Sequence, residues 1–156
     1  MSTLVMSKTI KVCPVLLAED DENDVYFLER AFQQVKIPHP IFRVADGDEA
    51  IRYLAGAGEY EDRTKFPLPG LMLLDLKMPR KNGFEVIEWV RNQPGLRRLP
   101  LVVFTSSKEQ PDLRQAYDLG ANTYLVKPVK FEDLVELVRA INSYWLTSAE
   151  MPDLQA

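Results

Sequence analysis

The sequence predicts one α/β domain built on a doubly wound, five-stranded parallel sheet with helices on both faces. Five short apolar runs alternate with stretches of helical periodicity, and the apolar runs are continuous. Continuous runs are typical of strands covered on both faces. The repeated strand–helix order favours parallel strands joined by right-handed crossovers. A chain of 156 residues is long enough to bury a core of this kind.

Each element has its own local signal. The predicted strands are CPVLLA (13–18), IFRV (41–44), LMLLD (71–75), LVVFT (101–105) and TYLVK (123–127). Apolar residues recur at helical spacing over 22–36, 83–92 and 131–145, and a short helix is expected over 47–55. A further helix is predicted within 106–120, where Ser107 and Gln110 have capping-box spacing and Gly120 follows the end. The segment 56–70, rich in Gly, Pro and charge, is expected to be a loop, either functional or a plain surface insertion.

Composition excludes several classes of protein. The net charge is -4 and no stripe of Lys and Arg interrupts it, which argues against a nucleic-acid partner. No apolar run reaches the roughly 20 residues of a membrane helix, and the first residues do not follow the pattern of a signal peptide. The single cysteine, Cys13, fits a reducing compartment and is expected to be a small buried residue, so we expect a cytoplasmic protein. His39, the single histidine, is expected in a loop rather than at a metal.

Polar residues follow four of the five predicted strands. Glu19-Asp20-Asp21 follow the first strand, Asp75 ends the third, Thr105 and Ser106 end the fourth, and Lys127 ends the fifth. Ligands of open parallel sheets bind beyond the carboxyl ends of the strands. If the first and third strands are neighbours, Asp20 and Asp75 converge, which is costly unless their charges are neutralised. Mg²⁺ suits such a site because it takes one or two carboxylates and completes its shell with water and phosphate oxygens.

These groups together favour phosphoryl transfer. A carboxylate such as Asp75 can accept a phosphoryl group covalently, Lys127 can reach a phosphoryl oxygen, and the Thr105 hydroxyl can donate a hydrogen bond. Each residue alone has a structural interpretation. The acidic triplet could cap a helix, Lys127 could be an ordinary surface lysine, and Thr105 an ordinary strand residue. The combination at four strand ends favours the functional interpretation.

The sequence resembles the receiver domain of two-component response regulators from about Val12 to Trp145. The pieces that match are LLAEDDEND, LLDLKMPRKNGFEVI, LPLVVFTSS and GANTYLVKPVKFEDL. The resemblance implies the flavodoxin-like strand order 2-1-3-4-5. It makes Asp75 the phospho-acceptor, Glu19 and Asp20 the acidic pair, and Thr105 and Lys127 the catalytic hydroxyl and lysine. It also implies that the backbone carbonyl of Lys77 is a metal ligand, that Tyr124 is the aromatic switch, and that the Lys127–Pro128 bond is cis.

The resemblance also implies a mechanism and partners. A histidine kinase would donate its phosphoryl group to Asp75 with Mg²⁺ present, Thr105 would move toward the phosphate, and Tyr124 would turn from exposed to buried. The surface of the fourth helix, fifth strand and fifth helix would change. The end of the sequence is similar to single-domain regulators that partner cyanobacterial and other bacterial phytochromes, so a phytochrome is one candidate donor. Such regulators tend to pair through the switch surface, which implies a homodimer.

The expected boundaries follow from the same resemblance. The receiver domain should span 10–146, with an N-terminal extension at 1–9, a loose C-terminal tail at 147–156 and no DNA-binding output domain. Tyr144 and Trp145 could serve the dimer or cover the core.

Two other functions stay open. A Mg²⁺-dependent phosphohydrolase with an aspartyl nucleophile usually has a second acid two residues past the nucleophile. Lys77 occupies that position and argues against turnover, so we expect the chain not to be an enzyme. A phosphorylation-independent interaction module is the other alternative. The positive side chain of Lys77 is expected at the mouth of the pocket, where it would change the hydrolysis rate of the acyl phosphate.

Overall fold

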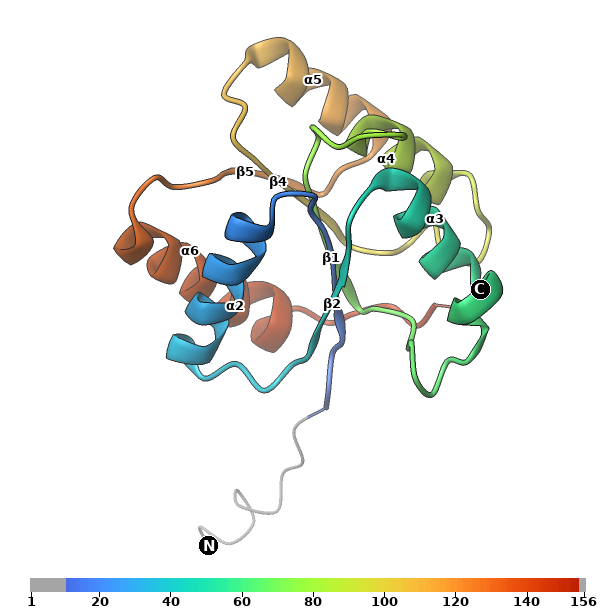
Figure 1. The fold of residues 1–156 in the computed structure, drawn as a ribbon, viewed down its shortest axis with the longest axis horizontal. Coiled ribbons are helices and arrows are strands. Elements are labelled where there is room, and N and C mark those ends of the chain that lie inside the picture. The colour runs from blue at the N-terminus through green and yellow to red at the C-terminus, as the bar shows by residue number, and fades with distance from the viewer. Residues whose placement is uncertain (1–10, 155–156) are drawn as a thin grey trace, which may run out of the picture.

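The computed structural model describes residues 11–154 and contains the expected five-stranded parallel sheet (Figure 1). The strands are β1 (Val15–Ala18), β2 (Ile41–Val44), β3 (Leu71–Leu74), β4 (Leu101–Thr105) and β5 (Thr123–Val126). Their order across the sheet is β2-β1-β3-β4-β5, and every neighbouring pair is parallel. The predicted fold class and strand order are confirmed.

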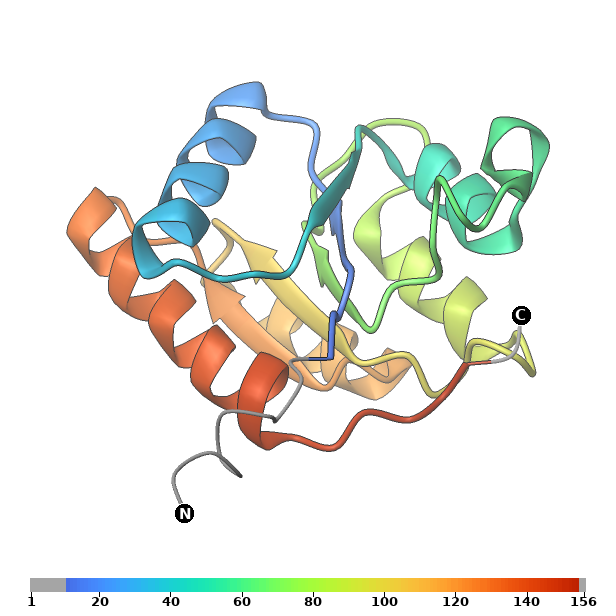
Figure 2. The same cartoon turned by 90° about the horizontal axis from the view of Figure 1, so that it is seen from below.

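Helices cover both faces of the sheet, as Figures 1 and 2 show. On one face lie α2 (Glu22–Val35) and α6 (Phe131–Ser143). On the other lie α3 (Gly47–Ala55), α4 (Gly83–Arg91) and α5 (Gln110–Leu119). Side-chain caps fix three of the starts: Asp21 for α2, Asp46 for α3, and Asn82 with Glu85 as a capping box for α4.

The capping box expected at Ser107 and Gln110 is wrong. The helix begins at Gln110 after Glu109, and no side chain caps it. The Ser107 hydroxyl instead donates to the Asp112 carboxylate at 2.6 Å and accepts the backbone N–H of Glu109 at 3.2 Å. Ser107 therefore shapes the β4–α5 loop through a charge-assisted bond to Asp112 rather than capping the helix start.

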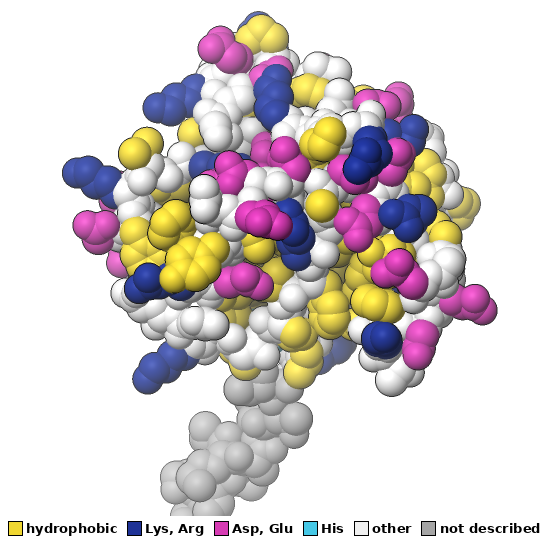
Figure 3. Space-filling model, viewed as in Figure 1, with side chains coloured by type: hydrophobic (Ala, Val, Ile, Leu, Met, Phe, Trp, Pro, Cys, Tyr) yellow, Lys and Arg dark blue, Asp and Glu magenta, His cyan; other side chains and the backbone are white. Residues whose placement is uncertain are grey.

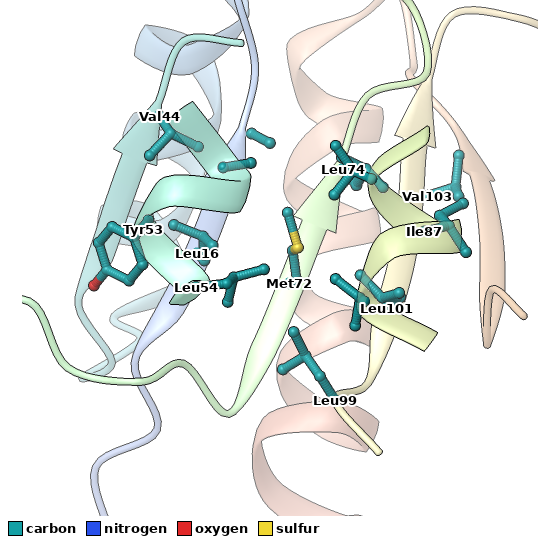
Figure 4. Close-up of a cluster of buried hydrophobic side chains, with 14 of the residues drawn as sticks. Leu16, Val44, Tyr53, Leu54, Met72, Leu74, Ile87, Leu99, Leu101 and Val103 are labelled. Carbon is teal, nitrogen blue, oxygen red and sulfur yellow. The ribbon is translucent and has the colours of Figure 1, made fainter. Parts of the chain in front are cut away.

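The core lies in two layers because successive strand residues point to opposite faces. Leu16, Met72 and Leu74 point toward α3 and α4, where they meet Leu54 and Ile87 (Figure 4). Val15, Leu17, Leu71 and Leu73 contact α2 and α6 on the other face. All four residues of β1 and of β3 are buried, which explains why their sequences are continuous apolar runs.

The segment 56–70 is anchored to the domain rather than loose. It contains a 3₁₀ turn, Gly58–Glu61, whose Tyr60 is buried and donates to a Glu49 carboxylate oxygen at 2.5 Å. The Tyr53 hydroxyl donates to the Pro67 carbonyl at 2.9 Å. The Arg63 guanidinium donates to the Tyr53 carbonyl at the end of α3 at 2.8 Å. The loop interpretation holds, and these contacts fix the loop against α3.

The C-terminal segment is not a free tail over its described part. After α6 the chain forms a π-helical turn, Tyr144–Ser148, and then passes beneath the sheet to the side of α4 (Figure 2). There Leu154 packs against the core layer of α3, α4 and α5. Trp145 packs against the opposite layer, while Tyr144 stays exposed. The expectation of a loose tail therefore fails, because apolar side chains hold this segment. The expected extension at 1–9 lies outside the described residues.

Two single residues sit near this segment. His39 lies in the loop before β2, as expected, but its side chain is buried, and Cys13 is half-buried with a free thiol. Within 11–154, no helix combines the length and apolar character needed to cross a membrane.

Candidate functional site

The pairing of β1 with β3 brings the predicted acids together at one rim of the sheet. Ala18 lies opposite Leu74, so Glu19 and Asp75 leave their strands side by side, and the Asp75 N–H donates to the Ala18 carbonyl at 3.1 Å. Glu19, Asp20 and Asp75 each place one carboxylate oxygen within 4.8 Å of the other two. The structure therefore shows the convergence that the strand order predicted.

Burial makes it costly for the carboxylates of this cluster to be negatively charged at the same time. Glu19 and Asp75 are 2% and 6% exposed, whereas Asp20 is exposed. Burial raises the pKa of Glu19 to about 7, and the negative charge of Asp75 adds to the rise. Two buried carboxylates at this spacing favour a cation between or beside them.

Lys127 supplies one cation. Its ammonium lies 2.5 Å from a Glu19 oxygen, 2.8 Å from an Asp24 oxygen and 3.2 Å from an Asp75 oxygen. Burial alone would lower the pKa of Lys127, but the hydrogen bonds that its ammonium donates to Asp24 and Glu19, together with the charge of Asp75, raise the pKa above the ordinary value. The lysine is thus held protonated and points at the predicted acceptor.

The end of β4 forms the next part of the rim. Thr105 is fully buried and lies opposite Val126 of β5, and its carbonyl accepts the N–H of Lys127 at 2.8 Å. The following residue, Ser106, is exposed and lines a cavity of about 410 Å³ beside Lys127. Phe27 of α2 and Phe131 of α6 line the same cavity. Space for an entering group therefore adjoins the ammonium.

Lys77 lies in the loop between β3 and α4. Its backbone N–H donates to an Asp75 oxygen at 3.3 Å, which places its peptide unit next to the carboxylate. Its side chain points away along the surface and pairs with Asp112 of α5 at 3.3 Å. The side chain is therefore engaged with α5, and it does not line the cavity beside Lys127.

Tyr124 of β5 is half-buried against the core layer of α3, α4 and α5. Its hydroxyl donates to the Ser107 carbonyl at 3.0 Å, and its backbone N–H donates to the Tyr117 hydroxyl at 3.2 Å. The ring thus lies on the inner side of the β4–α5 loop.

Charges are mixed over the face that Figure 3 displays, where basic and acidic side chains alternate without a stripe of one sign. Hydrophobic side chains gather over α2 and α6 in the same view. Tyr26 and Phe27 of α2 are among the exposed ones. The ring of Phe27 lies 6.2 Å from that of Phe131.

Comparison with known proteins decides the family. Residues 15–139 match the family described as the response regulator receiver domain, a range that covers the whole sheet and about two thirds of α6. The chain belongs to this family.

The chain is similar to known response regulators, one of which is described as a phytochrome response regulator. The response regulator Rcp1 of Synechocystis sp. is 36% identical over 138 residues, which cover 88% of this chain and 92% of that protein. The phosphorylated cyanobacterial phytochrome response regulator RcpA has a TM-score of 0.85 and 34% identity, covering 92% of this chain and 100% of that one. The Mn²⁺-bound form of response regulator Rcp1 has a TM-score of 0.81 and 36% identity, covering 90% of this chain and 99% of that one.

The acidic cluster of this receiver domain fits a divalent metal. All its side-chain donors are carboxylate oxygens, and hard cations such as Mg²⁺ and Mn²⁺ prefer oxygen ligands. Two of the three carboxylates are buried, so they cannot be neutralised by solvent counterions alone.

Sequence reasoning missed one member of the site and misjudged one bond. The missed residue is Asp24, whose carboxylate contacts Lys127. Asp24 follows the acidic triplet by three residues and lies in the first turn of α2, and this position could have identified it as a member of the site. The Lys127–Pro128 bond is trans, as is every described peptide bond, so the cis expectation is wrong. Trans is the favoured form even before proline, and Lys127 reaches its three carboxylates with it.

Proposed function

We propose that this receiver domain accepts a phosphoryl group on Asp75 from a histidine kinase in a Mg²⁺-dependent reaction. We further propose that the phosphorylated form signals to a protein partner through the surface of α5, β5 and α6. The observation that carries the proposal is the convergence of Glu19, Asp20 and Asp75 on one side of Lys127. A buried carboxylate flanked by a cation site and a fixed ammonium suits phosphoryl transfer, which depends on positioning and charge stabilisation.

The proposed ligands of the metal are Asp20, Asp75 and the backbone carbonyl of Lys77, with Glu19 contacting it through water. When bound, Mg²⁺ would neutralise charge on the phosphoryl oxygens. Occupied or not, the side chains have distinct roles. Asp75 forms the new bond, and Lys127 moves part of its contact from carboxylate to phosphoryl oxygen. The Thr105 hydroxyl donates to the same group.

The transfer needs only the phosphohistidine donor, Asp75 and a proton from solvent. One carboxylate oxygen of Asp75 attacks the phosphorus of a phosphohistidine as the N–P bond breaks. The imidazole leaves with the electron pair of that bond and takes a proton from solvent. The product on this chain is an acyl phosphate at Asp75.

Lys77 supports signalling rather than turnover. The position two residues past Asp75 carries an ammonium paired with Asp112, so it offers no carboxylic acid to protonate a leaving group. A phosphohydrolase of the aspartyl type would need such a group.

The partner is proposed from the relatives. Because the chain covers the whole length of the phytochrome response regulator RcpA at 34% identity, we propose a phytochrome histidine kinase as the donor. We also propose a homodimer through the α5–β5–α6 surface, where Tyr117 is exposed. Light scattering after size-exclusion chromatography would give a monomer mass if this second proposal is wrong.

The test is a phosphorylation assay with a small donor. Wild type incubated with Mg²⁺ and acetyl phosphate should gain the mass of one phosphoryl group, and removing Mg²⁺ with a chelator should abolish the gain. Asp75→Asn should show no gain. Asp118→Asn, which removes an exposed acid at the far end of α5, should behave as wild type. Phosphate on Asp75→Asn, or none on wild type, would refute the assignment.

A further inference from the structure

A continuous set of contacts joins the acceptor loop to Tyr124. Lys77, two residues past Asp75, pairs with Asp112 at 3.3 Å. Asp112 also accepts the Ser107 hydroxyl at 2.6 Å, through the same carboxylate oxygen. The Ser107 carbonyl in turn accepts the Tyr124 hydroxyl at 3.0 Å. The Asp112 side chain therefore links the β3–α4 loop to the β4–α5 loop.

We propose that Asp112 is a positioning residue that, with Lys77, holds the β4–α5 loop and Tyr124 in the inward arrangement before any phosphate is present. The inference rests on the proposed function and on the expectation, implied by the resemblance to receiver domains, that Tyr124 turns inward when Asp75 is phosphorylated. In this chain, contacts outside the acidic cluster would already stabilise the inward arrangement in part before phosphorylation. Asp112 contacts neither the proposed metal ligands' carboxylates nor the cavity beside Lys127.

The contacts have the strength that such a bias needs. The Asp112 side chain is only 18% exposed, and a hydroxyl–carboxylate bond of 2.6 Å is short and charge-assisted. The Ser107 hydroxyl and then Lys77 lower the pKa of Asp112, so the carboxylate stays ionised. Lys77 is 64% exposed, so its ion pair alone contributes little. A shift of a few-fold between two arrangements is therefore expected rather than an all-or-none effect.

Two simpler roles for Asp112 predict different results. As an acid in the first turn of α5, it could merely stabilise that helix. As a negative charge near the pocket, it could merely repel an incoming anion. Removing the charge would then tighten the binding of a phosphoryl analogue, whereas the positioning role predicts weaker binding. The sign of this effect separates repulsion from positioning, and an unchanged affinity would favour the helix-stabilising role.

The first experiment needs no phosphoryl chemistry. Wild type is labelled with 3-fluorotyrosine, and the ¹⁹F resonance of Tyr124 is assigned by its absence in Tyr124→Phe. We expect an inward Tyr124 in wild type and a shift toward the solvent-exposed position in Asp112→Asn and in Lys77→Met. Asp118→Asn, on the same helix with the same charge change, should leave the resonance in place. An unchanged resonance in both Asp112→Asn and Lys77→Met would overturn the inference.

The second experiment measures coupling to the site. Beryllofluoride with Mg²⁺, an analogue of the aspartyl phosphate, should bind Asp112→Asn about three- to fivefold more weakly than wild type. Lys77→Met should weaken beryllofluoride binding to a similar extent. The double variant should bind no more weakly than whichever single variant binds more weakly. Tighter binding by Asp112→Asn, or additive losses, would refute the proposal. If wild type itself binds no beryllofluoride, the proposed function fails, and the fluorine experiment still reports separately on Tyr124.

Discussion

At the scale of single residues, Lys127 decides the electrostatics of the acidic rim. Its side chain is 11% exposed and contacts one carboxylate of α2 and the carboxylates that directly follow β1 and β3. A buried ammonium surrounded in this way is stable because its attraction to the three carboxylates offsets the free-energy penalty of desolvation. Lys127 therefore stabilises the metal-free fold, and in the proposed function the same ammonium contacts a phosphoryl oxygen.

Replacing Lys127 by Met should destabilise the metal-free protein. Met keeps most of the volume but leaves the buried acids Glu19 and Asp75 without their ammonium. We expect a loss of about 3 kcal/mol in the free energy of unfolding, measured by urea denaturation at pH 8. Millimolar Mg²⁺ should recover part of this loss, because a divalent cation can neutralise the same carboxylates.

Lys130→Met provides the matched control, because Lys130 is an exposed lysine three residues further on. Its free energy of unfolding should stay within about 0.5 kcal/mol of wild type. Equal stability of Lys127→Met and Lys130→Met without metal would show that Lys127 does not balance the acidic rim.

At the scale of elements, the β3–α4 loop is held by its contact with the start of α3. Arg80 adopts a left-handed backbone, with φ 65°, and its guanidinium pairs with Asp46 at 2.9 Å. Non-glycine residues occupy this region at a cost, so the ion pair helps to fix a conformation that the loop would otherwise leave. Gly47 lets the loop approach: a Cβ added there would lie 2.0 Å from the Lys81 carbonyl oxygen. The loop that carries Lys77 thus depends on α3.

Gly47→Ala should push this loop away from the acidic rim. We expect a loss of about 3 kcal/mol in stability, because the Cβ meets backbone that cannot yield without moving the loop. The affinity for Mg²⁺ should also fall, since the proposed Lys77 carbonyl ligand moves with the loop. Thermal denaturation and a metal titration would check both.

Gly58→Ala separates clash from strain. Gly58 has φ 57°, but a Cβ there meets nothing within 4 Å. The substitution should cost about 1 kcal/mol through backbone strain alone and leave Mg²⁺ binding unchanged. Equal effects of the two alanines would mean that the approach of Lys81 to α3 has no bearing on the site.

The elements also show how far the sequence carried the prediction. The central strands β1, β3 and β4 were predictable because both of their faces are buried. The acids were predictable because strand ends in parallel sheets share one rim. The cap of α5 was predicted wrongly because the Ser107 hydroxyl binds the carboxylate of Asp112, five residues further on, instead of capping the helix. The anchoring of 56–70 was missed because Tyr60 and Arg63 bind residues of α3 that only folding brings near. Local patterns predict elements, whereas contacts between elements decide loops.

At the scale of the whole molecule, His39 ties three distant segments together at the rim opposite the acids. Its Nδ1 accepts the N–H of Cys13, just before β1, at 2.9 Å. Its ring also faces the backbone carbonyl of Leu146 in the turn after α6. Burial lowers the pKa of His39, while the Leu146 carbonyl acts in the opposite direction with a smaller effect. The neutral ring is therefore the form that the fold accommodates.

This arrangement predicts a loss of stability in mild acid. In the unfolded chain His39 takes up a proton near pH 6.5, while the folded protein resists protonation to lower pH. The unfolded state then binds more protons, so the free energy of unfolding falls as pH decreases below about 6.5 and levels off below the folded pKa. Glu19, whose pKa is raised to about 7 by burial, acts with the opposite sign: its contribution to stability is present at low pH and lost as pH rises. The net slope of wild type alone therefore cannot be assigned to either residue.

His39→Asn resolves the two contributions, because Asn can still accept the Cys13 N–H but does not titrate, and the chain has no other histidine. The variant should be less stable at pH 8 through lost packing. Between pH 7.5 and 5.5 the stability difference from wild type should shrink, since only wild type loses the His39 contribution, and the slope from Glu19 is common to both. Urea denaturation at several pH values, without metal, measures this difference. A gap between the two proteins that stays constant over that range would show that the fold admits the protonated ring, and that the contact of His39 with Cys13 and Leu146 does not depend on its charge.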